Sequence, residues 1–366
     1  MKIINENLDI EVEPSLRKIS PLENILFFDI ETTGFSHKTS SLYLIGCIYY
    51  QDHRWHLKQF FGEGKQEECE LLQSFYDFSK TFTTWVNYNG NGFDFPYLTG
   101  KYQKYFMDIP FVDIHKVDLY QSILPYKKIL KLPSLKQKNI EQYLNMKRED
   151  PFDGGQLIEL YHVYMTTGDE KLLHVLLLHN KEDLIGLTKL IPLLHYSYLF
   201  KGNFMIQDLN FVDGIAFDGR EKLEVILTFT FDHTIPVPFS HTADGIYFTC
   251  NRNHGKLKIP VYTGTLKFFY PNYKDYYYLP EEDIALHKSV ATYVDKEFRV
   301  QAKANTCYGK KDGLFLPQFI PLYSPEFKEH YHSKETYFEC NQEMMDSSDS
   351  LHDYIHHLLQ HLRTSS

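Results

Sequence analysis

The sequence lacks the features that mark a membrane protein or a protein of an oxidising compartment. No run of apolar residues approaches the ~20 that span a bilayer, and the start, MKIINENLDIEVEP, lacks the basic and then apolar layout of a secretory signal. The 5 cysteines are odd in number and scattered, with no Cys/His cluster at zinc spacing. We therefore expect a soluble, cytoplasmic protein without a disulfide framework, a structural zinc site or a membrane partner.

An overall excess of basic charge is also absent. The net charge of −10 argues against a general polyanion binder. One window between Lys127 and Arg148 departs from this average, because its basic residues face a single acid, Glu141. The basic residues are Lys127, Lys128, Lys131, Lys136, Lys138, Lys147 and Arg148. A solvated helix face is the commoner meaning of such a run, and contact with phosphate is the alternative.

What the sequence has in abundance is aromatic side chains, with 28 Tyr and 28 Phe among 366 residues. With 43% hydrophobic and 23% charged residues, the chain is expected to be folded over most of its length. The length predicts two domains. A change of pattern near residue 200 gives their limits as an N-terminal extension over 1–23, an α/β domain over 24–200 and a β-rich accessory domain, ending in helices, over 201–366.

Within the α/β domain, three apolar strands over 23–31, 41–50 and 54–61 are expected to form a meander. A helix is expected over 134–144 with Ser134 as its cap, and a long helix over 170–198 that Pro192 kinks or ends. In the second half, the segments KLKIPVY and TLKFFYP predict separate strands. A helix is expected from Pro280 to Phe298, and a short amphipathic one over 347–363.

The strongest local signal is the segment FFDIETTG. Asp29 and Glu31 alternate with Ile30 at the end of an apolar strand, so both carboxylates leave the same face of a sheet. Paired carboxylates before a Thr-Thr-Gly turn suit a hard cation bound through oxygen. The alternative is a charged strand end without a ligand, but the apolar residues directly before the acids make that placement costly.

Two further motifs are weak when taken alone. In NYNGNGFDFPYL, Asp94 follows a Gly/Asn-rich turn at the mouth of a helix, and an ordinary turn is the simpler interpretation. In HNKEDLIGL, His179 and Asp183 lie one helical turn apart, so an imidazole and a carboxylate would face the same direction. A helical salt-bridge lattice is the alternative there. Taken in chain order, however, the three motifs form one set.

In that order the motifs resemble those of the DEDD (DnaQ-like) 3′–5′ exonuclease superfamily, which has a ribonuclease H-like fold. The stretch YNGNGFDFPYL is similar to the second exonuclease motif of family-B DNA polymerases, and residues 24–200 resemble the YprB-like ribonuclease H-like proteins of bacteria. The resemblance implies an α/β domain with a mixed sheet flanked by helices. It also implies hydrolysis of phosphodiester bonds at the 3′ end of single-stranded DNA or RNA. The second half resembles no family.

The resemblance implies a role for each motif residue. Asp29, Glu31, Asp94 and Asp183 would hold two Mg²⁺ or Mn²⁺ ions, and His179 would deprotonate the attacking water. The spacing of His179 and Asp183 is that of the members that use tyrosine, so this pair combines two signatures. Asp118 in KVDLY is a further carboxylate that could support the site, although a structural role or a place along the substrate path is favoured.

Substrate contacts are predicted around these motifs. The expected cationic path comprises Lys127, Lys128, Lys131 and Lys136. Asn89, Phe93 and Phe95 could contact the terminal nucleotide, with packing of the two Phe rings as the alternative. A second basic segment over 296–311 and the aromatic second half could extend the path, but a solvated face and core packing are favoured. Two other functions stay open: a non-catalytic single-strand binder on the same fold, and a phosphodiesterase of small oligonucleotides or nucleotides.

Overall fold

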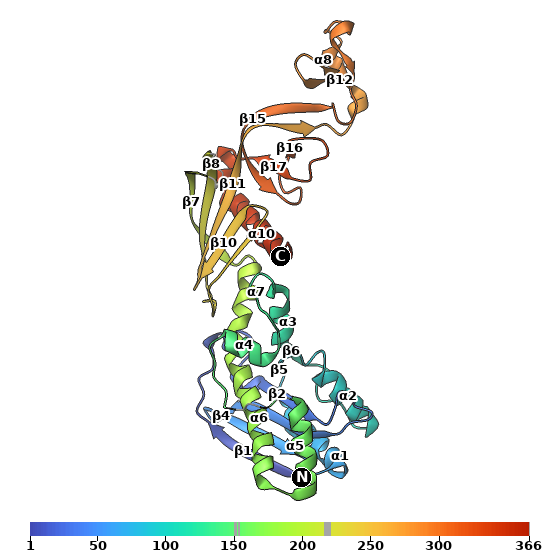
Figure 1. Ribbon diagram of the computed structural model, residues 1–366, viewed down its shortest axis with the longest axis vertical. Helices are drawn as coiled ribbons and strands as arrows, with labels where there is room; N and C mark the ends of the chain where they lie inside the picture. Colours follow the sequence, from blue (N-terminus) through green and yellow to red (C-terminus); the bar gives the residue numbers. More distant parts are fainter. Residues whose placement is uncertain (150–151, 153, 216–220, 366) are drawn as a thin grey trace. The chain divides into compact units, whose positions relative to one another are not determined.

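The computed structural model describes residues 1–149, 152, 154–215 and 221–365. They form two compact units, unit 1 (Met1–Ser197 with Ile235–Val237) and unit 2 (Tyr198–Thr234 with Pro238–Ser366). Unit 1 combines a mixed sheet with helices and unit 2 is rich in β-structure, which confirms the predicted fold class (Figure 1). Among the helices of the described ranges, none combines the length and the apolar character needed to cross a bilayer.

The sheet of unit 1 has the strand order β1-β4-β3-β2-β5-β6. The predicted meander is present as β2 (Ile25–Thr32), β3 (Leu42–Gln51) and β4 (Arg54–Phe61), each antiparallel to the next. On the other side of β2, β5 (Thr84–Asn87) and β6 (His115–Asp118) add in parallel. The apolar runs of β2 and β3 are buried, as central strands covered on both faces must be.

The chain before residue 24 contributes to this sheet rather than standing apart from it. β1 (Lys2–Leu8) pairs with β4 along its length, from Lys2 opposite Phe61 to Leu8 opposite Trp55. The segment KIINENL is mostly polar and exposed because it forms an edge strand, so it lacks the apolar run by which the inner strands are recognised. The units divide within α7 (Leu194–Phe200), and the predicted domain limits stay a prediction.

Helices cover both faces of the sheet in unit 1. On one face, Leu26, Phe28 and Ile30 pack with α1 (Glu68–Ser79) and α2 (Asp94–Lys104). On the other face, residues of β3 and β4 pack with α5 (Gly154–Thr167) and α6 (Glu170–Lys189). Since side chains alternate along a strand, Asp29 and Glu31 leave β2 on the face opposite to Phe28 and Ile30, which is the α6 face.

Two helix predictions need adjustment in unit 1. The helix expected over 134–144 is α4 (Gln137–Tyr143), and Ser134 does not cap it, because the Ser134 hydroxyl accepts the Lys136 N–H in a local turn. Between α2 and α4 lies a short helix, α3 (Leu119–Ile123). The long helix α6 ends at Lys189, and Pro192 begins the separate turn that leads to α7, as the sequence predicts.

Unit 2 is built around an eight-stranded antiparallel arrangement. Its central strand β11 (His254–Phe269) unites the two strands predicted from KLKIPVY and TLKFFYP, because one continuous strand pairs first with β8 and β10 and then with β15 and β16. The remaining strands of this arrangement are β7 (Phe204–Ile215), β8 (Glu221–Phe231), β9 (Phe239–Ala243), β10 (Ile246–Asn251), β15 (Tyr308–Gln318), β16 (Phe327–Lys328) and β17 (Thr336–Glu339).

The helix predicted from Pro280 to Phe298 is wrong. Within 280–298 the chain forms the strand β13 (Ile284–His287), which pairs with β12 (Tyr276–Leu279), and then the four-residue α8 (Lys288–Ala291). β14 (Val300–Gln301) follows and also pairs with β12. Asp283 adopts a left-handed conformation in the β12–β13 turn and accepts hydrogen bonds from Tyr278 and Lys310, which stabilises the turn. The predicted C-terminal helix is present as α10 (Ser348–Thr364), preceded by α9 (Gln342–Asp346).

Candidate metal centre

The three sequence motifs converge at the end of β2. Glu31 from β2 and His179 and Asp183 from α6 each offer a ligand atom, and these atoms lie within 4.8 Å of one another. His179 Nε2 is 3.3 Å from Asp183 Oδ2 and 3.8 Å from Glu31 Oε1. The two α6 residues share a face, as their spacing predicts, and the imidazole lies buried between the two carboxylates.

Asp29 is positioned by α6 through Asn180, which the sequence analysis did not single out. Asn180 Nδ2 donates to Asp29 Oδ2 at 3.0 Å, and Gln59 in turn donates to Asn180 Oδ1 at 2.9 Å. The close approach depends on Gly46, which pairs with Asp29 in β3; a Cβ at Gly46 would lie 1.8 Å from Asn180 Oδ1. The helix therefore reaches the acidic end of β2 only because β3 has no side chain there.

Asp94 begins α2 and is buried. Burial raises the pKa of Asp94 to about 7, and the negative charge of Asp118 adds to this rise, while the backbone amides of Asp94 and Ile30 oppose it. Ile30 separates Asp29 from Glu31, so the Asp94 carboxylate lies against the strand that carries the first motif. Asp29 and Asp94 are not part of the three-residue group above, but Asp94 acts electrostatically on Asp29.

The pKa values of Asp29 and Asp183 shift in opposite directions, because their neighbours differ. Burial raises the pKa of Asp29 well above its usual value, and the charges of Glu31, Asp94 and Asp183 add to the rise. For Asp183, burial also favours the neutral form, but contacts with His179 and Arg148 outweigh it and lower the pKa. A divalent cation would relieve the repulsion among these acids. Carboxylate oxygens are the donors that Mg²⁺ and Mn²⁺ prefer, so the acids present fit such an ion.

Arg148 belongs to this site rather than to an exposed cationic path. Its guanidinium forms ion pairs with both Asp183 and the buried Glu141. Gln137 supports the same group, donating to Glu141 Oε1 at 3.0 Å and to the Asp183 carbonyl at 2.8 Å. Lys138 also turns inward and donates to the Phe152 carbonyl. These two basic residues of the window therefore have structural partners.

Asp118 has the structural role that the sequence analysis favours. Its carboxylate accepts hydrogen bonds from the backbone amides of Asn89 at 2.9 Å and Asn91 at 3.0 Å, and so shapes the turn before Asp94. It also caps α3 by accepting the Tyr120 N–H at 3.0 Å. The buried Asp118 thus connects the second motif with the start of α3.

The predicted substrate residues fall into different environments. Phe95 is only 4% exposed and packs against Phe28 and Trp85, so it belongs to the core, which is the packing alternative that the sequence left open. Its place is explained by the first turn of α2, which points it toward the sheet. Phe93 is partly exposed, and its ring lies 6.2 Å from that of Phe35, which is 94% exposed. Phe93 therefore keeps an accessible aromatic surface, which Phe35 extends.

A cavity of about 610 Å³, here called the side cavity, collects part of the predicted cationic path. Asn89, Lys127 and Lys136 line it, whereas Lys128 and Lys131 do not. The wall also includes Gln137, which contacts Asp183. Sequence reasoning missed two aromatic residues of the wall, Tyr88 and Tyr120. Tyr88 directly precedes Asn89, and Tyr120 lies two residues after Asp118, so both are close in sequence to residues that the motifs single out. Nothing in the local sequence pattern indicates that the two rings line the same cavity.

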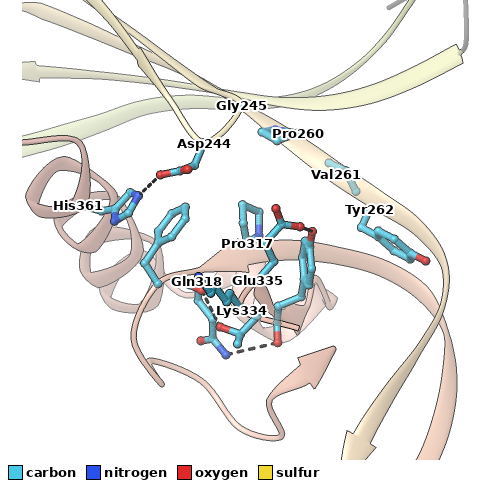
Figure 2. Close-up of a pocket in the computed structure, with 13 residues that line it drawn as sticks. Asp244, Gly245, Pro260, Val261, Tyr262, Pro317, Gln318, Lys334, Glu335 and His361 are labelled. Carbon is cyan, nitrogen blue, oxygen red and sulfur yellow. Dashed lines mark hydrogen bonds and ion pairs between the residues drawn. The ribbon is translucent and has the colours of Figure 1, made fainter. Parts of the chain in front are cut away.

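Unit 2 contains a cavity of about 600 Å³ of a different kind. Figure 2 shows the ion pair between His361 of α10 and Asp244, with Lys334, Glu335 and Tyr262 elsewhere on the wall. His361 Nε2 lies 2.7 Å from Asp244 Oδ2, and the His361 ring stacks on Phe319. None of the predicted site residues lines this cavity.

Residues 26–195 match the family model described as the RNase_H superfamily. A search of curated proteins gives no match. Among solved structures, the family B DNA polymerase of the hyperthermophilic archaeon Pyrobaculum calidifontis is 16% identical with a TM-score of 0.38, covering 70% of this chain and 36% of that chain. E. coli Exonuclease I in complex with a dT13 oligonucleotide is 13% identical with a TM-score of 0.30, covering 56% of this chain and 54% of that chain.

This chain therefore spans about a third of the polymerase and about half of the exonuclease. At these identities and TM-scores, function does not follow from the structural likeness. The family match and the mixed six-stranded sheet together define unit 1 as a ribonuclease H-like domain, with the β-rich unit 2 beside it in the sequence.

Proposed function

We propose that this chain is a metal-dependent 3′–5′ exonuclease of the DEDD type, close to the YprB-like proteins, that hydrolyses single-stranded DNA or RNA. The proposal rests on one observation, the meeting of the first and third motifs at the end of β2, with Asp94 of the second motif against the same strand. Glu31, His179 and Asp183 offer ligand atoms within 4.8 Å of one another. A ribonuclease H-like sheet that gathers this group, with Asp29 and Asp94 acting on it, is suited to hydrolysis of a phosphodiester.

In this proposal Asp29, Glu31, Asp94 and Asp183 would hold two Mg²⁺ or Mn²⁺ ions. Bound at these acids, the ions would lower the pKa of water and offset the charge that develops on the leaving oxygen. Asn180 keeps Asp29 in place through its hydrogen bond. His179 Nε2, which lies between Glu31 and Asp183, accepts the proton of the attacking water, and Asp183 stabilises the resulting imidazolium.

The side cavity supports the single-strand part of the proposal. Lys127 and Lys136 give it positive charge, and Asn89 connects it with the turn before Asp94. Phe93 and Phe35 offer exposed rings beside that turn. The phosphate backbone is common to all nucleotides, so cleavage without sequence preference is expected. A cytoplasmic location stays a prediction from the sequence.

The experiment is release of label from 3′-labelled and 5′-labelled single strands, as DNA and as RNA, with Mg²⁺, Mn²⁺ or chelator. We expect metal-dependent release of the 3′ label as a mononucleotide. Asp29→Asn and Asp183→Asn should each lower the rate by about two orders of magnitude or more, since charge stabilisation by bound metal contributes several kcal/mol.

The matched control is Asp108→Asn, which removes an exposed carboxylate of unit 1 and should leave the rate unchanged. Thermal unfolding of each variant separates a lost reaction from a lost fold. Full activity of Asp29→Asn or Asp183→Asn would contradict the proposal. Binding of strands without hydrolysis in any metal would instead favour a non-catalytic binder, and hydrolysis confined to dinucleotides would favour a small-molecule phosphodiesterase.

A further inference from the structure

The side cavity has a wall built from three separate segments. Tyr88 and Asn89 come from the turn after β5, and Tyr120 and Leu124 from α3 and its end. Lys127 and residues 133–137 form the rest of the wall, and the cavity is open to solvent. Its volume of about 610 Å³ lies within the range of small-ligand pockets, roughly 300–1,000 Å³. The cavity is therefore large enough for one nucleotide.

The aromatic part of this wall is held in a fixed arrangement. The rings of Tyr88 and Tyr120 meet edge to face, with centroids 5.9 Å apart. Tyr88 Oη donates to the Leu135 carbonyl at 2.7 Å, which ties the β5 turn to the segment before α4. The Tyr120 backbone is anchored by the Asp118 carboxylate. Rigid aromatic rings of this kind offer a stacking surface to any nucleobase.

The charged part of the wall has one sign. Lys127 and Lys136 are exposed lysines that line the cavity, and no aspartate or glutamate is among its lining residues. The nearby Glu141 is engaged by Arg148 and Gln137 and does not line the cavity. In a chain with a net charge of −10, an acid-free cavity with two lysines is complementary to a phosphate group.

The cavity also adjoins the candidate metal centre. Gln137 lines the cavity and donates to the Asp183 carbonyl, while Asn89 lines it and belongs to the turn that leads to Asp94. We infer that the side cavity binds one nucleotide of a single strand that extends from the metal centre, with the base against Tyr120 and the phosphate near Lys127 and Lys136. This inference rests on the proposed function and adds a subsite to it.

The first test uses the lysines. Binding of fluorescent single strands, as DNA and as RNA, is measured by anisotropy on the full chain with chelator, at several salt concentrations. The variant Lys127→Ala/Lys136→Ala should lower the slope of log affinity against log salt by about 0.7 per lysine. The control Lys147→Ala/Lys189→Ala removes two exposed lysines of unit 1 that do not line the cavity, and should leave the slope unchanged.

The second test uses the ring of Tyr120. Tyr120→Ala should weaken binding of a normal strand by about tenfold, whereas Tyr120→Phe keeps the ring and should bind like the unaltered chain. On a strand of abasic sites, Tyr120→Ala and the unaltered chain should bind equally, because no base is present to stack. A loss of the same size on the abasic strand would indicate a folding defect and overturn the stacking assignment.

The outcomes separate this inference from the proposed function. Equal effects of the two lysine pairs, in a chain that does hydrolyse strands, would overturn the subsite and leave the exonuclease standing. Dependence on Lys127, Lys136 and Tyr120 without hydrolysis in any metal would support the subsite and reject the exonuclease. Absence of strand binding, or binding of a free mononucleotide alone, would overturn the subsite.

Discussion

The two units treat polar side chains in opposite ways. Unit 1 buries several ionisable groups, among them Glu68, Asp94, Lys101, Asp118 and Glu141. In unit 2, the buried polar side chains of the described residues are Gln318 and His357, and neither is an acid. Because burying a charge is costly unless it is paired, the buried charges of unit 1 need partners or a function. This comparison agrees with the proposed metal centre, which lies in unit 1.

Within unit 1, a second comparison separates structural from functional acids. Glu68 is fully buried, yet hydrogen bonds from Lys101, the Leu42 amide, Tyr105 and Lys104 outweigh the effect of burial and lower its pKa. Asp29 receives a hydrogen bond from Asn180 but is surrounded by other carboxylates, and its pKa is raised. Two acids near the same sheet therefore shift in opposite directions. The acid paired with lysines, Glu68, stabilises the fold, and the acid crowded by other carboxylates, Asp29, marks the candidate metal centre.

In unit 2 the charges are paired at the surface. Lys310 lies 3.0 Å from Asp283, and Lys311 lies 2.6 Å from Glu339. The guanidinium of Arg299 lies over the Tyr277 ring. At these positions the basic residues of the second segment contact neighbouring side chains, and an extension of the strand path by this segment stays a prediction.

The largest expected effect on stability concerns the buried ion pair of unit 1. Lys101 and Glu68 are both fully buried, with Nζ 2.6 Å from Oε1. Lys101→Met keeps the aliphatic length but leaves a buried carboxylate without its main partner, so we expect a loss of about 3–5 kcal/mol in unfolding free energy. Denaturant unfolding followed by tryptophan fluorescence measures it, because both tryptophans, Trp55 and Trp85, lie in unit 1.

The control is Glu68→Gln combined with Lys101→Met, which removes both charges and should recover part of the loss. A loss below about 1 kcal/mol for Lys101→Met alone would show that Lys104 and Tyr105 suffice for Glu68. The distinction between the interiors of the two units would then be weaker than the burial pattern indicates.

An intermediate effect on stability is expected from Arg148, which forms an ion pair with Asp183 of the candidate metal centre. Arg148→Ala removes the ion pairs with Asp183 and with Glu141, which is only 1% exposed, and should cost about 2–3 kcal/mol. Arg148→Lys should not restore this stability, because an ammonium group cannot bond both carboxylates as a planar guanidinium does. Thermal unfolding with chelator measures the loss.

Adding Mn²⁺ should narrow the difference between Arg148→Ala and the unaltered chain, since the cation would stabilise Asp183 in place of the guanidinium. A matched control is Lys147→Ala, which removes the neighbouring exposed charge and should leave both measurements unchanged. If Mn²⁺ raises the unfolding temperature of neither protein, the candidate metal centre itself is in question.

The sequence predicts those parts of the site that depend on local periodicity. The alternation of a strand places Asp29 and Glu31 on one face, and the helical repeat does the same for His179 and Asp183. The meander and the long helix follow from apolar patterns of the same kind. The meeting of the three motifs at one end of the sheet was implied by the family resemblance rather than by periodicity.

What the sequence does not predict depends on tertiary contacts. Arg148 reads as one more charge in a basic window, because its partner Asp183 lies far along the chain. Asn180 gains its role only because Gly46 lets α6 approach β3. The sequence around Phe95 is compatible with either an exposed or a buried ring, and the ring is buried because it packs against Phe28. The wrong helix at 280–298 has the same cause, since cross-strand pairing overrides its helical spacing.

The smallest expected effect on stability concerns an exposed ion pair of unit 2. Lys311 and Glu339 form a pair in unit 2 with the same 2.6 Å separation as Lys101 and Glu68, but their side chains are 47% and 28% exposed. Lys311→Ala should therefore cost no more than about 1 kcal/mol, and the cost should fall further at high salt. Hydrogen exchange across unit 2 measures it, since tryptophan fluorescence reports on unit 1. Equal losses of unfolding free energy for Lys311→Ala and Lys101→Met would show that the distance between the charged atoms, and not their burial, determines how much each pair stabilises the protein.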